Sequence, residues 1–162
     1  MRGGTGRSIA RLVLAACLLG PALAMSQSQE SGRLLCDQIE SLVDAVCDCT
    51  RTACRPAPGG AQGTRSFIVL SSEPVFSGED SKREWVLVAV AAVGYALNGN
   101  ATFRGDEVWL SDTDQMRERV AYVVSAEVAK SLQRRVKANE ITLDEMYAEI
   151  LKHMTPRPMP AD

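Results

Sequence analysis

Residues 85–97 read Trp85-Val-Leu-Val-Ala-Val-Ala-Ala-Val-Gly-Tyr-Ala-Leu97, thirteen positions without a charged or strongly polar side chain. Whether they form a helix or a strand determines which kind of domain the chain builds. Ser81 followed by Glu84 is a capping-box pattern, the next dipeptide Asn98-Gly99 is a helix stop signal, and the alanines favour helix. Four valines and an Asn-Gly dipeptide also fit a long strand that enters a hairpin. We predict a buried helix.

Short strands are expected on both sides of this helix. Residues 66–76 are rich in β-branched and aromatic side chains, which predicts a strand with Pro74 near its edge or end. After the helix, residues 101–103 and 107–110 predict a hairpin about the turn Arg104-Gly105-Asp106.

A long helix is predicted from Ser111, with Asp114 in its first turn. Its apolar positions follow the helical period through Met116, Val120, Val123, Val124, Val128, Leu132 and Val136. The basic side chains Lys130, Arg134, Arg135 and Lys137 fall near its end, where the helix dipole favours cations.

A last helix is predicted from Thr142, which forms a capping box with Glu145, while Ile141 and Met146 form a hydrophobic staple. Its expected buried stripe comprises Leu143, Met146, Tyr147, Ile150, Leu151 and Met154. Residues 155–162 contain three prolines and are expected to be a disordered tail.

Towards the N-terminus, residues 33–47 predict an amphipathic helix with the stripe Leu35, Ile39, Leu42, Val43 and Val46. Cys36 and Cys47 share its face. Along a helix they lie about 16 Å apart, whereas a disulfide needs α-carbons within about 7 Å, so they cannot pair with each other.

For the four cysteines Cys36, Cys47, Cys49 and Cys54, two pairings are left. We favour Cys36 with Cys49 and Cys47 with Cys54 over Cys36 with Cys54 and a tight Cys47–Cys49 ring. The alternative to a structural role is thiol redox chemistry or a soft metal ion on these thiols. No CxxC pair is present and the single histidine, His153, is distant, so no metal ligand set or cofactor is predicted.

The first residues predict an export signal. Arg2, Arg7 and Arg11 precede an apolar run over residues 12–20, then Pro21 and Ala22-Leu23-Ala24, which suits cleavage after Ala24. The run is too short to span a bilayer, which takes about 20 residues. The alternative is a lipobox, Leu14 to Cys17, with lipidated Cys17. Cleavage removes Cys17 and leaves four cysteines, an even number that is consistent with disulfides in an exported protein. Export also predicts a periplasmic protein in a bacterium or otherwise a secreted one.

Removal of 24 residues takes three arginines and no acid from 18 basic and 20 acidic residues, leaving 138 residues and a net charge near −5. Such a chain builds one domain and lacks the basic field that nucleic-acid binding needs. No Gly-x-Ser-x-Gly, metal-type histidine pair or phosphate loop is present, so no catalytic residue is predicted.

The predicted organisation is a signal peptide (1–24), a flexible N-terminus (25–32), a disulfide-stapled helix and loop (33–55), a Pro/Gly linker (56–64), an α+β core (65–154) and the tail (155–162). The expected fold is a small α+β domain with a short antiparallel sheet and C-terminal helices packed on it. The expected function is that of an exported, non-catalytic binding or assembly module with an unknown protein or small-molecule partner. The alternative is a thiol-redox or metal-handling protein that uses Cys36, Cys47, Cys49 and Cys54.

Overall fold

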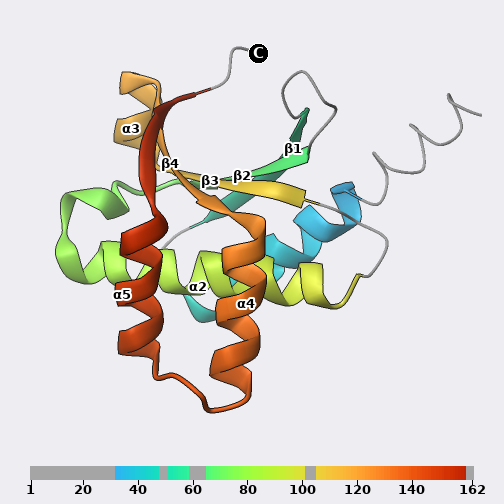
Figure 1. The fold of residues 1–162 in the computed structure, drawn as a ribbon. Helices are drawn as coiled ribbons and strands as arrows, with labels where there is room; N and C mark the ends of the chain where they lie inside the picture. Colours follow the sequence, from blue (N-terminus) through green and yellow to red (C-terminus); the bar gives the residue numbers. More distant parts are fainter. Residues whose placement is uncertain (1–31, 48–50, 59–64, 101–104, 160–162) are drawn as a thin grey trace, which may run out of the picture.

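A computed structural model of the chain describes residues 32–47, 51–58, 65–100 and 105–159 (Figure 1). The predicted signal peptide, Cys17 and Cys49 lie outside the described residues, as does the linker beyond Pro58. The predicted α+β class is confirmed. One mixed sheet is covered on one face by helices, and the core lies between the two layers.

The sheet has five strands in the order β1-β2-β3-β4-β5, which is also their order along the chain. The strands are β1 (Thr52–Pro58), β2 (Arg65–Ser71), β3 (Gly105–Ser111), β4 (Val120–Ser125) and β5 (Thr155–Pro158). β2 and β3 are parallel and the other neighbours are antiparallel. The sheet is therefore mixed rather than antiparallel throughout, because a helix crosses over between β2 and β3.

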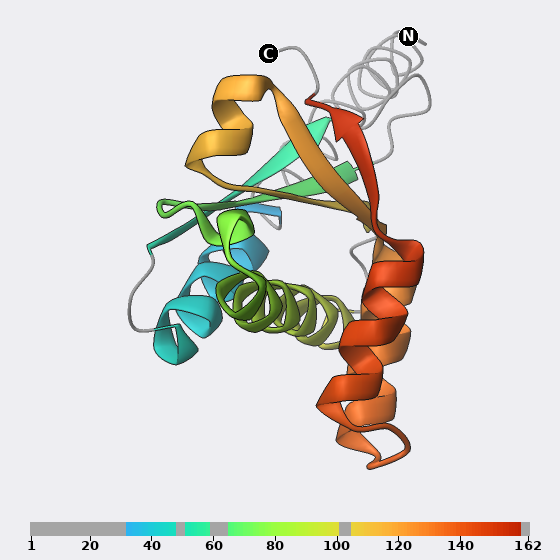
Figure 2. The same ribbon diagram turned by 90° about the vertical axis from the view of Figure 1, so that its left-hand side faces the viewer.

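Helices cover one face of the sheet, as Figure 2 shows. They are the N-terminal helix (residues 32–46), α2 (Glu79–Asn98), α4 (Ala126–Lys137) and α5 (Leu143–His153). The short helix α3 (Thr113–Glu118) joins β3 to β4 on the other side of the sheet, and a 3-10 turn, η1 (Val75–Ser77), precedes α2.

The predicted helix over residues 85–97 is confirmed by α2, whose C-cap is Gly99, with its N–H donating to the Tyr95 carbonyl at 3.0 Å. The helix begins earlier than the apolar run. The predicted capping box at Ser81 is wrong, because Gly78 is the N-cap and the Ser81 hydroxyl donates to the carbonyls of Val75 and Gly78.

The predicted long helix from Ser111 is wrong, since the segment forms α3, β4 and α4. Arg119 ends α3 in the left-handed region at φ 56°, and β4 follows. The N-cap of α3 is Asp112, not Ser111, and its carboxylate accepts the N–H groups of Asp114 and Gln115. Val123 and Val124 are adjacent in β4 and both buried, and their spacing from Val120 matches the helical period by coincidence.

Two other predictions are wrong about pairing. β3 pairs with β2 on one side and β4 on the other, which contradicts the hairpin predicted about Arg104-Gly105-Asp106; residues 101–104 lie outside the described residues. Residues 155–158, expected in a disordered tail, form β5 against β4. Prolines are accepted there because β5 is an edge strand. The predicted strand over 66–76 holds only to Ser71, and the predicted linker begins inside β1.

Candidate functional site

An apolar depression lies along α2, where this helix meets the N-terminal helix, α4 and α5. Figure 2 shows α2 between the N-terminal helix and the α4–α5 pair. A cavity of about 360 Å³ opens where these elements meet. We call it the apolar groove; it is lined by Leu42, Val46, Val88, Ala91, Ala92, Tyr95, Gln133, Val136, Lys137, Leu143 and Met146.

Large apolar side chains stand exposed at the rim of this groove. Val46 is 59% exposed, Tyr95 50% and Leu143 57%. Val46 and Leu143 were predicted as members of buried stripes, and the structure instead leaves them at the groove. Scattered exposed apolar residues are ordinary, but three around one apolar depression form a contiguous surface of the kind that binds ligands.

The groove exists because the helices flanking α2 are held away from each other. On one side, Cys36, Glu40 and Asp44 lie four residues apart, on one face of the N-terminal helix. Cys36 forms a disulfide with Cys54 of β1, with α-carbons 5.0 Å apart. The Glu40 carboxylate accepts the Cys54 N–H at 2.6 Å.

The Asp44 carboxylate accepts the N–H of Thr52 at 2.8 Å, again in β1. We use the name edge clamp for the five residues that make these contacts, which are Cys36, Glu40, Asp44, Thr52 and Cys54. It draws the N-terminal helix to the free edge of the sheet and occupies backbone donors that an edge strand otherwise exposes.

On the other side of α2, α4 packs at very short range. A β-carbon added to Gly94 would collide with the carbonyl oxygen of Ala129 and lie 2.8 Å from the Gln133 β-carbon. Only glycine leaves room for this approach, so α4 packs directly against one flank of α2. The edge clamp holds the N-terminal helix on the other flank.

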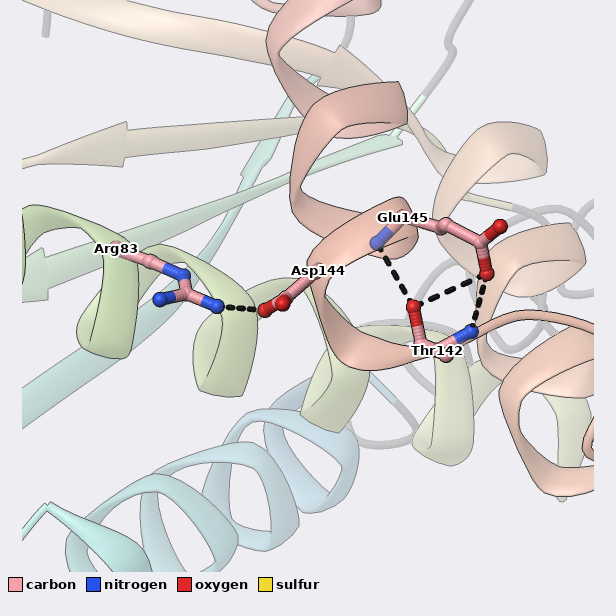
Figure 3. A network of polar contacts seen from close by, with 4 residues as sticks. All are labelled: Arg83, Thr142, Asp144 and Glu145. Atoms are coloured by element: carbon pink, nitrogen blue, oxygen red, sulfur yellow. Dashed lines mark hydrogen bonds and ion pairs between the residues drawn. The ribbon is translucent and has the colours of Figure 1, made fainter.

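The α5 wall of the groove is fixed by polar contacts at the start of that helix (Figure 3). The Thr142–Glu145 capping box predicted from the sequence is confirmed: the Thr142 N–H donates to the Glu145 carboxylate at 2.7 Å and the Glu145 N–H to the Thr142 hydroxyl at 3.2 Å. Arg83 of α2 pairs with Asp144, and its guanidinium lies over the Tyr147 ring. These contacts orient the turn that carries Leu143 and Met146 into the groove.

A second cavity of about 350 Å³ adjoins the apolar groove. The two share Tyr95, Gln133 and Lys137. We call the second cavity the polar pocket; its other lining residues are Leu35, Gln38, Ala96, Asn98, Gly99 and Asn100. The Asn98 amide nitrogen donates to the Lys130 carbonyl at 3.0 Å and to the Gln133 side-chain oxygen at 2.7 Å. These bonds fix the Gln133 side chain at the junction.

Positive charge surrounds the C-terminal half of α4. A hydrogen bond from Lys130 holds the pKa of Glu127 below its usual value, and Arg134 adds a smaller effect. Hydrogen bonds from Thr142 lower the pKa of Glu145, with a smaller contribution from Arg135. Lys137 makes no ion pair with any residue that the structure describes. The shared boundary of the two cavities therefore carries a cation that no carboxylate in the described part of the chain neutralises.

The favoured cysteine pairing is wrong, because Cys36 bonds Cys54 rather than Cys49. The predicted pairing avoids a tight Cys47–Cys49 ring, whereas the helix–strand contact of the edge clamp brings Cys54 to Cys36. Cys47 is buried, and Cys49 lies outside the described residues, so the Cys47–Cys49 ring stays a hypothesis.

The described residues add no observation in favour of the redox or metal alternative. Cys36 is 2% exposed. Within the described ranges, no three His, Cys, Asp or Glu side chains are grouped so as to hold a metal ion. Nor does any helix among them have the length and hydropathy to cross a membrane.

Comparison of the chain with models of known protein families, with curated proteins and with solved structures finds no match.

Proposed function

We propose that this protein is an exported, non-catalytic binding module that holds a small apolar ligand in the apolar groove. The observation that carries the proposal is the groove itself: about 360 Å³, within the range of small-molecule sites, with Val46, Tyr95 and Leu143 exposed around it. Burying these side chains under a ligand removes apolar surface from water, which favours binding.

The chemistry of the lining supports binding rather than catalysis. Its described residues include no Ser, Thr, Cys, His, Asp or Glu to work with Tyr95 or Lys137, the two lining side chains that can transfer a proton. Tyr95, Gln133 and Lys137 supply polarity at one end only.

Export is supported by the signal-peptide pattern over residues 1–24 and by the Cys36–Cys54 disulfide, since such bonds persist outside the reducing cytosol. The intact mass of protein recovered from the exported fraction should correspond to a chain that starts at Met25 without lipid. A diacylated chain starting at Cys17 would contradict this route and place the protein at a membrane surface.

The ligand site is tested with the neutral fluorescent probe N-phenyl-1-naphthylamine. Ala91→Phe fills the groove and should weaken probe binding at least tenfold. Ala148→Phe adds the same ring at an exposed position of α5 that does not line the groove, so it should leave binding unchanged. Circular dichroism melts of both variants control for folding. Equal probe binding by a folded Ala91→Phe variant would sink the proposal.

A further inference from the structure

The apolar groove and the polar pocket meet at Tyr95, Gln133 and Lys137, so a ligand long enough to fill both must be apolar at one end and polar at the other. Leu42, Val46 and Val136 line only the first cavity. Gln38, Asn98 and Asn100 line only the second. The pair of cavities has the polarity gradient of a linear amphiphile.

The charge at the junction selects the sign of the polar end. Lys137 is the one described residue lining either cavity that is charged at neutral pH, and no carboxylate is among the described residues that line them. By contrast, Lys130 on the same helix is neutralised by Glu127 at 2.7 Å. An anionic head group placed at the junction would form an ion pair with Lys137, which none of the described residues does.

The hydrogen-bonding groups at the junction point to the same answer. One lone pair of the Gln133 side-chain oxygen already accepts from Asn98, while the Gln133 amide nitrogen is a donor that a ligand can use. The Lys137 ammonium also only donates. A head group that only accepts hydrogen bonds, such as a carboxylate, matches these donors, whereas an alcohol or an ammonium matches them less well.

We infer that the joined cavities bind a linear amphiphile with an anionic head, its alkyl chain in the apolar groove and its head against Lys137 and Gln133. This inference rests on the proposed function, because it specifies the ligand of the same groove. The ion pair lies in a partly exposed site, so its contribution should fall as salt concentration rises.

The test compares three ligands of equal chain length, decanoate, 1-decanol and decyltrimethylammonium, by isothermal titration below their micelle concentrations. Decanoate should bind at least tenfold more tightly than 1-decanol, and decyltrimethylammonium least tightly. Lys137→Met should abolish the preference for decanoate while 1-decanol binds as before. Lys152→Met removes a charge from α5 outside both cavities and should preserve the preference.

The outcomes separate the inference from the function on which it rests. Equal binding of decanoate and 1-decanol, unaffected by Lys137→Met but weakened by Ala91→Phe, would overturn the anionic head and leave the groove as the ligand site. Binding of none of the three, with the neutral probe also indifferent to Ala91→Phe, would overturn both. A decanoate preference that survives Lys137→Met would place the head group elsewhere and contradict the inference alone.

Discussion

The N-terminal helix and α4 flank the same helix, α2, but they are attached in opposite ways. The N-terminal helix is fastened to the edge of the sheet by a disulfide and two carboxylates. α4 is attached by close packing of backbone on backbone at Gly94. The difference shows that two strong, separated attachments can leave the surface between them open. We regard the apolar groove as the product of this arrangement.

The largest effect is expected from loss of the Cys36–Cys54 disulfide. The Cys36→Ser/Cys54→Ser variant removes a cross-link with a sequence separation of 18. A loop of that size corresponds to about 3 kcal/mol of unfolding free energy in the chain-entropy account. Denaturant unfolding of the variant measures this loss. A midpoint equal to that of the unaltered protein would show that the carboxylates alone hold the helix.

The α2–α4 contact should respond to a single methyl group. Gly94→Ala should destabilise the protein by about 2 kcal/mol, because the new β-carbon meets backbone atoms that cannot rotate away. Gly99→Ala is the matched control, since its β-carbon would lie 3.5 Å from the nearest atom, the Tyr95 carbonyl oxygen. Thermal melts compare the two. Equal melting temperatures would contradict the packing ascribed to Gly94.

The carboxylate part of the edge clamp should contribute less. Glu40→Ala leaves the Cys54 N–H without its acceptor and should cost about 1.5 kcal/mol, the lower end for hydrogen bonds to charged groups. Glu40→Gln keeps an acceptor at the same place and should recover most of the loss. Urea unfolding measures both. Identical losses in the two variants would show that packing, not the hydrogen bond, is what Glu40 provides.

The smallest effect concerns the start of α5, which carries the groove residue Leu143. Hydrogen bonds from Thr142 lower the pKa of Glu145 below its ordinary value of 4.5. A lowered folded-state pKa means that the stabilisation is complete above 4.5 and is lost as pH falls through the folded-state value. As pH is lowered below 4.5, the free energy of unfolding of Glu145→Gln should therefore fall less than that of the unaltered protein. The same loss of unfolding free energy in both proteins would contradict the role assigned to the capping box.

Elements with strong local signals could be predicted from the sequence. The N-terminal helix, α2 and α5 have apolar stripes or runs, and Thr142 with Glu145 marks the start of α5 so clearly that its cap was placed correctly. β4 and β5 could not be predicted, because their strand character comes from pairing with each other and with β3. The helical spacing of Val120, Val123 and Val124 hid a strand, although consecutive β-branched residues were a signal against helix.

The groove lay beyond prediction for a related reason. Periodicity identifies apolar stripes such as those of Val46 and Leu143 but does not say which members the tertiary fold covers. The four-residue spacing of Cys36, Glu40 and Asp44 is a usable signal for one helix face. The sequence of their common partner, β1, however, predicts a loop and a linker instead of a strand. Lys137 was interpreted as a cation at a helix end, and only the structure places it between two cavities.

Mapping a ligand on methyl resonances shows directly whether the surface between the two attachments is a ligand site. N-phenyl-1-naphthylamine is aromatic, so its ring currents shift nearby methyl signals. We predict shifts at Leu42, Val46, Val136 and Leu143, which line the groove, and none at the exposed Leu151 of α5. Shifts at Leu151 with no shift at the four groove residues would show that the apolar groove is not the ligand site.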